Sequence, residues 1–143
     1  MFSFRIGSTN WGNAQAWIGL SGATVAQIGA DGGENLSSRS FVGFRGTAAN
    51  ANWGLYSQAG GVTISTNFGS VAIGTSSTNT FQLQFISTNA VLNSVIGYID
   101  GVPIATNQVA LPSVGLEETI CIRTTENVAK GLVFYFFYGE QDP

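Results

Sequence analysis

Residues 81–85 read Phe-Gln-Leu-Gln-Phe, which is the clearest alternation of apolar and polar side chains in the chain. Successive side chains of a strand point to opposite faces, so the three apolar residues would line one face and the two glutamines the other. A strand of this kind has one face against a core and the other in water. That arrangement is typical of an antiparallel sheet.

Similar short runs predict strands at residues 2–6, 16–20, 40–45, 53–58, 95–99, 102–106, 118–124 and 132–138, with polar loops at 7–13, 29–38, 47–52 and 74–80. The Asp100-Gly101 pair predicts a type I′ hairpin turn, because both residue types tolerate a positive φ. Pro103 then has to lie on an edge strand or turn its missing N–H away from the ladder. No run of about twelve residues shows a helical stripe.

The fold class predicted from this pattern is all-β. A chain of 143 residues is long enough to bury a core, and no linker divides it. About ten short strands in one domain are typical of a β-sandwich, most simply a jelly roll. We therefore expect residues 1–143 to form a single antiparallel β-sandwich domain.

The composition excludes several classes of chemistry. The chain has no histidine, so it cannot assemble a Ser-His-Asp triad, a Cys-His pair or an HExxH zinc site by itself. Charged residues make up 9%, against about 25% in a typical domain, so small polar residues and backbone must cover most of the surface. We expect no catalytic residue, no cofactor and no enzymatic activity.

The acidic residues and the cysteine agree with that expectation. Glu117 and Glu118 are adjacent and would point to opposite faces of a strand, so they cannot flank one glycosidic bond. Cys121 lies in an apolar run and is interpreted as a small buried hydrophobe rather than a nucleophile. Residues 31–35 gather oxygen ligands that could hold calcium, but an ordinary glycine-rich turn is favoured and no metal site is predicted.

Nucleic acid and membrane are excluded as expected partners. The five basic residues are scattered along the chain, whereas nucleic-acid binding needs a basic cluster. No window approaches about 18 uninterrupted apolar residues, and the N-terminal residues lack the pattern of a secretory signal. We expect neither a membrane-spanning segment nor a targeting segment.

The tryptophans suggest where contacts could form. Trp17 and Trp53 lie in predicted strands and are expected in the core, whereas Trp11 lies in a loop and is the best candidate for exposure. An exposed Trp serves equally well in a subunit interface and in a sugar site. The candidate interface or glycan contacts, from two polar loops, are Trp11, Asn13, Asp31, Glu34 and Asn35.

The second half of the chain resembles modules of the concanavalin A-like jelly-roll superfamily. The residues that carry the likeness are 80–85, the run from Val95 through Asp100-Gly101 to Thr106, and Leu111-Pro112. Residues 121–138 are similar to the end of variants found in bacteriophage virion proteins, and Trp53 with Gly60-Gly61 is similar to their middle portion. The likeness covers most of residues 39–138. It is a pattern of turns and apolar positions, which indicates the fold better than the function.

The resemblance implies a non-enzymatic module on a phage particle, either a capsid decoration protein or part of a fibre or tail. Its partners would be other virion subunits and further copies of itself, with a trimer favoured. A lectin-like module that binds host glycan is the alternative. The virion would be assembled in the host cytoplasm and then be extracellular. Such modules commonly have a further strand upstream of the first, so we also expect a partner or another copy to cover the sheet edge left open here. The alternative expectation is that residues upstream were processed away or not included.

Overall fold

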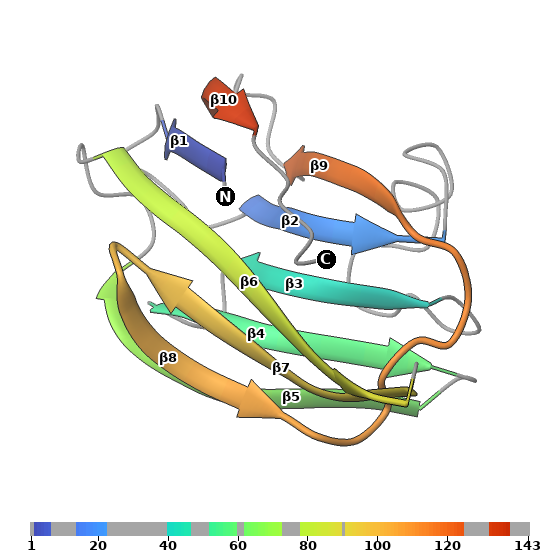
Figure 1. Ribbon diagram of the computed structural model, residues 1–143. Helices are drawn as coiled ribbons and strands as arrows, with labels where there is room; N and C mark the ends of the chain where they lie inside the picture. The colour runs from blue at the N-terminus through green and yellow to red at the C-terminus, as the bar shows by residue number, and fades with distance from the viewer. Residues whose placement is uncertain are drawn as a thin grey trace.

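The computed structural model describes residues 2–6, 14–22, 40–46, 52–59, 62–72, 78–89, 91–124 and 132–137. Within these ranges the chain forms β-strands and no helix, and every strand pair is antiparallel. The strands make two five-stranded sheets (Figure 1). The predicted all-β class and the antiparallel pairing are confirmed, and two sheets of this kind are compatible with a β-sandwich.

The first sheet has the strand order β10 (Leu132–Phe137), β1 (Phe2–Ile6), β6 (Thr78–Thr88), β7 (Val91–Ile99) and β8 (Val102–Asn107). The second sheet has the order β5 (Val62–Ala72), β4 (Asn52–Ala59), β3 (Phe41–Gly46), β2 (Ala14–Ser21) and β9 (Glu117–Thr124). Each sheet joins strands from both ends of the chain, through the β1–β10 pair in the first and the β2–β9 pair in the second (Figure 1).

Each strand predicted from the sequence is present, but three features differ. β5 was not predicted, although Val62, Ile64 and Phe68 alternate with polar residues along it. β6 and β7 are longer than the predicted strands and meet at a tight turn near Asn89. The loop predicted over residues 74–80 was wrong at its end, because residues 78–80 pair with β1 as the start of β6.

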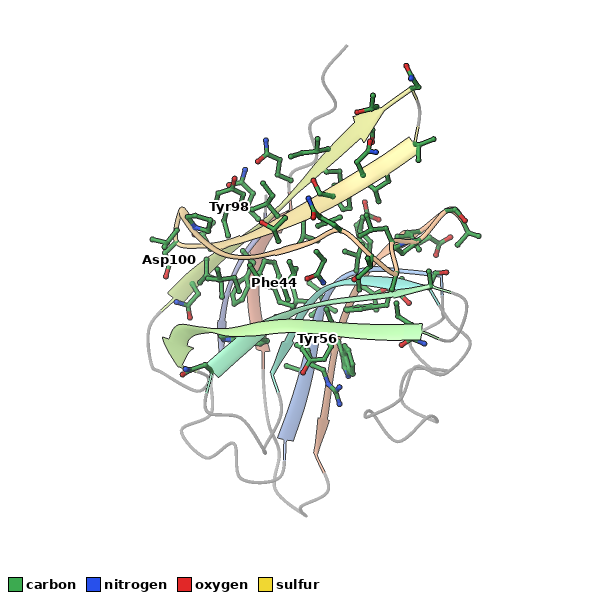
Figure 2. The ribbon with its side chains drawn as sticks, turned by 90° about the horizontal axis from the view of Figure 1, so that it is seen from below. Phe44, Tyr56, Tyr98 and Asp100 are labelled. Carbon is green, nitrogen blue, oxygen red and sulfur yellow. The ribbon has the colours of Figure 1, made fainter. Side chains whose placement is uncertain are left out.

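The two sheets pack against each other through aromatic rings. Phe81 of β6 lies 5.0 Å from Phe44 of β3 and 5.0 Å from Trp53 of β4, measured between ring centroids, and both contacts are edge-to-face. Phe44 lies between the sheets in Figure 2. Edge-to-face rings gain electrostatic energy in addition to apolar burial. The surrounding core consists of Ala16, Ile18, Leu55 and Ile99, all of them fully buried.

Glycines set how closely the backbones approach. Gly19 of β2 and Gly43 of β3 are direct partners in the ladder. A Cβ on Gly19 would lie 2.3 Å from the carbonyl oxygen of Val42, and one on Gly43 would lie 2.3 Å from that of Ile18. Between the sheets, a Cβ on Gly97 would lie 3.0 Å from side-chain atoms of both Leu55 and Phe44. These positions therefore leave no room for a side chain.

The hairpin turn between β7 and β8 matches its prediction. Asp100 and Gly101 both have positive φ, at 52° and 77°. The Asp100 carboxylate also accepts hydrogen bonds from the Asn79 side-chain amide at 2.8 Å and from the Thr80 backbone N–H at 2.7 Å. Pro103 is exposed on β8, an edge strand, as expected. The turn therefore fastens the end of β7 to the start of β6.

A buried polar contact joins the two sheets beside the apolar core. The side-chain amide of Asn107 in β8 donates to the hydroxyl oxygen of Ser57 in β4 at 3.0 Å, and that hydroxyl donates to the carbonyl oxygen of Val109 at 3.0 Å. Asn107 and Ser57 are both buried. Because buried polar atoms are costly without partners, this chain of hydrogen bonds fixes the segment after β8 against the second sheet.

The glycine pair provides a test of the backbone approach. We expect Gly19→Ala or Gly43→Ala to lower the free energy of unfolding by about 3 kcal/mol, because backbone atoms cannot move aside as a side chain can. Chemical denaturation monitored by circular dichroism measures this change. Gly115→Ala is the matched control, since a Cβ there meets no atom within 4 Å. Equal stability of all three variants would contradict the close approach.

Candidate functional site

The most distinctive surface is the outer end of the β6–β7 hairpin, residues 84–93, which we call the hairpin end. Phe85, Ile86 and Val91 are 41%, 40% and 61% exposed there, although large apolar side chains are usually buried. Figure 2 shows the joined ends of β6 and β7 extending beyond the other strands. The hairpin end is therefore an exposed projection on which three large apolar side chains stand among polar ones.

The position of Phe85 corrects one expectation from the sequence. Phe81, Leu83 and Phe85 share a face of β6, and all three were expected in the core. Phe81 is fully buried and Leu83 is partly buried against the core, but Phe85 is exposed. The expectation for Phe85 was wrong because the hairpin continues past the buried part of its sheet, so regular alternation alone does not show where burial stops.

The hairpin end is held by regular pairing at its base. Phe85 pairs with Val95, and after one register shift Ser87 pairs with Leu92 and Thr88 with Val91. Near the base, the hydroxyl of Tyr98 donates to the side-chain oxygen of Gln84 at 2.8 Å. The described backbone of β6 and β7 is thus paired up to Thr88 and Val91. The exposed apolar side chains of the hairpin end therefore project from a hydrogen-bonded ladder.

The chemistry of the hairpin end suits contact rather than catalysis. Its sequence, QFISTNAVLN, contains no charged residue. Phe85 and Ile86 are adjacent in a strand, so they project from opposite faces of the hairpin. Exposed apolar residues gathered at one place mark interaction surfaces more often than scattered ones do. A partner that encloses the hairpin end from two sides would bury both faces.

A second cluster lies on the face of the second sheet that points away from the first. The Arg45 guanidinium carbon lies 4.4 Å from the ring centroid of Trp17 and 5.1 Å from that of Tyr56. Trp17 also makes edge contacts with Phe41 and Tyr56. Figure 2 shows Tyr56 on the side of its sheet opposite Phe44. Arg45 is only 8% exposed, so we interpret this cluster as a structural cation–π contact rather than a binding site.

The structure tests only some of the residues singled out in the sequence. Trp17 and Trp53 are buried, as predicted. Cys121 lies in β9 opposite Trp17, but its side chain is outside the described part, so its predicted burial stays a prediction. The candidate contacts in the two polar loops also lie outside the described residues: Trp11, Asn13, Asp31, Glu34 and Asn35.

Among the described residues, no group of three His, Cys, Asp or Glu side chains lies close enough together to hold a metal ion. Asp100 is engaged by the hydrogen bonds of its turn, while Glu117 and Glu118 are exposed at the start of β9. The described part also contains no helix with the length and apolar content needed to cross a membrane.

No protein-family model and no curated protein matches the sequence. The function is therefore inferred from the arrangement of the described residues and from the sequence patterns.

The Arg45 cluster can be tested by removing its charge. We expect Arg45→Met to lower the free energy of unfolding by about 1–2 kcal/mol, because the apolar length is retained while the cation over two rings is lost. Guanidinium chloride denaturation followed by tryptophan fluorescence measures the effect. Gln108→Met, an exposed position, is the control and should change the stability by less than about 0.5 kcal/mol. Equal effects of the two variants would contradict the structural role of Arg45.

Proposed function

We propose that this chain is a non-enzymatic structural protein of a bacteriophage particle. It would act as a capsid decoration protein or as a fibre or tail module, and would attach to other virion subunits and to further copies of itself. It would be assembled into the virion in the host cytoplasm and then be extracellular. The observation that carries the proposal is the hairpin end, an uncharged projection that exposes Phe85, Ile86 and Val91 on a paired β-ladder.

Three further observations support this proposal. The second half of the sequence resembles virion modules in its turns and apolar positions. Charged residues make up only 9% of the chain, which suits a surface engaged by neighbouring subunits. The absence of histidine removes the commonest catalytic base. Each of these favours attachment over catalysis.

The proposed finer fold is a concanavalin A-like jelly roll. The long-range pairs β1–β10 and β2–β9 favour it, since they bring strands from the two ends of the chain together in both sheets. The Asp100-Gly101 hairpin also lies at the place where the resemblance puts one. Experimental strand connections through the remaining loops would test this topology.

The attachment proposal predicts that the chain remains with virus particles. Particles purified by density gradient from the phage that encodes this chain should contain it, as detected by mass spectrometry and immunogold electron microscopy. We expect Val91→Asn to weaken attachment of the recombinant chain to chain-free particles by about tenfold, the size of a moderate interface contact. Sedimentation with the particles measures this affinity.

Val102→Asn is the matched control, because Val102 is 59% exposed, comparable to Val91, but pairs with Ile99 at the opposite end of β7. It should attach as the wild type does. A wild-type chain found only in the soluble host fraction would overturn the proposal. Retention of one sugar on a glycan array by a chain that does not attach to particles would instead support the lectin-like alternative.

A further inference from the structure

The hairpin turn between β7 and β8 contains a dipeptide with its own chemistry. Asp100 is followed by Gly101, and both residues are exposed. In an Asp-Gly pair the backbone nitrogen of the glycine can attack the aspartate carboxyl carbon, because no side chain on the glycine hinders the approach. Asp31-Gly32, outside the described residues, is the other such pair in the sequence. The exposed turn therefore places a reactive pair at the surface of the molecule.

The attack rearranges the backbone and needs no other reactant than water. The Gly101 nitrogen forms a bond to the Asp100 carboxyl carbon, a carbon–oxygen bond of the carboxyl group breaks, and one water molecule leaves. The product is a five-membered succinimide ring. Water then opens the ring at one of its two carbonyl carbons, which gives either aspartate again or isoaspartate. In isoaspartate the main chain runs through the side-chain carbons, so it is one atom longer.

The backbone of the closed turn opposes this reaction. Asp100 has a φ of 52°, which for a residue with a side chain is the left-handed region. In that region the nitrogen of the next residue lies on the far side of the Cα–C bond from Cβ. The Gly101 nitrogen is therefore turned away from the Asp100 side chain, and ring closure requires the backbone of the turn to rotate.

Hydrogen bonds of the Asp100 side chain oppose the reaction as well. One carboxylate oxygen accepts a hydrogen bond from the Asn79 side-chain amide at 2.8 Å, and the other accepts one from the Thr80 backbone N–H at 2.7 Å. The Asp100 backbone N–H in turn donates to the Thr80 carbonyl oxygen at 2.8 Å. Both carboxylate oxygens are thus held toward β6. To reach the Gly101 nitrogen, the carboxyl group has to leave both donors.

We propose that Asp100-Gly101 is a latent site of isoaspartate formation that the closed turn shields. Asn79 and Thr80 of β6 hold the carboxyl group away from the nitrogen that attacks it. The reaction then proceeds in chains whose turn has opened. This site does not depend on the assignment to a virus particle, because it rests on the turn alone.

Conversion at this site is one-way for the fold. A two-residue hairpin turn accepts no additional main-chain atom, and the free carboxylate of isoaspartate branches from a different carbon. The hydrogen bonds to Asn79 and Thr80 therefore cannot re-form together. A converted chain keeps the end of β7 detached from the start of β6. The amount of isoaspartate at position 100 then records how often the turn has opened.

A protease that cleaves before aspartate but not before isoaspartate reads out the reaction. In the unmodified chain it cuts before Asp31, Asp100 and Asp142. Isoaspartate at position 100 leaves residues 31–141 uncut, whereas isoaspartate at position 31 leaves residues 1–99 uncut. The chain is aged at neutral pH, either folded or in urea, and is then unfolded and digested. Mass spectrometry distinguishes and quantifies the uncut fragments.

We expect Asp100 of the folded wild type to isomerise about tenfold more slowly than Asp100 of the chain in urea. Asn79→Ala removes one of the two donors and should raise the rate in the folded chain about tenfold, the effect of one hydrogen bond to a charged group on opening of the turn. It should leave the rate in urea unchanged. Asn93→Ala, at an exposed asparagine of β7, is the matched control and should behave as the wild type. Circular dichroism establishes that each variant is folded.

Two outcomes would overturn the proposal. One is an equal rate of isomerisation at Asp100 in the folded and the unfolded wild type, a comparison that needs no variant. The other is a folded Asn79→Ala variant that isomerises no faster than Asn93→Ala. Asn79→Ser, which also removes the amide donor, takes its place where Asn79→Ala does not fold.

Discussion

The contact of the Phe81 ring with Phe44 and Trp53 determines how the two sheets lie against each other. It joins the central strand of the first sheet to two strands of the second, and all three rings are fully buried. The neighbouring core residues pack around these rings. Gly97 allows the same region to close, because any side chain there would press on Phe44 and Leu55. The described core thus depends on large rings facing a residue without a side chain.

This core occupies only part of the length of β6 and β7. Beyond Leu83 on β6 and Ser94 on β7 the same two strands continue as a paired ladder whose side chains are exposed, apart from the half-buried Leu92. The inner half of the β6–β7 hairpin therefore stabilises the fold, and its outer half presents apolar side chains at the surface. At the opposite end of the hairpin, the Asp100 carboxylate accepts hydrogen bonds from Asn79 and Thr80 at the start of β6. These hydrogen bonds fix the end of the hairpin from which the exposed half extends.

The sequence predicted the strand content well because period-two patterning and the Asp-Gly turn are local signals. It predicted the burial of Trp17 and Trp53 correctly, but could not place Trp17 on the outer face with Arg45, since that depends on neighbouring strands. The hairpin end was missed because Ser87, Thr88 and Asn89 resemble a loop, although Ser87 and Thr88 continue the ladder. The candidate residues Trp11 and Asp31 lie outside the described part, so their roles remain predictions.

The absence of charge from residues 84–93 has a consequence for conditions outside a cell. Salt weakens interactions between exposed charges, with a screening length of about 10 Å at 0.1 M ionic strength, but it leaves apolar burial largely intact. The proposed attachment through the hairpin end would therefore persist from fresh water to sea water.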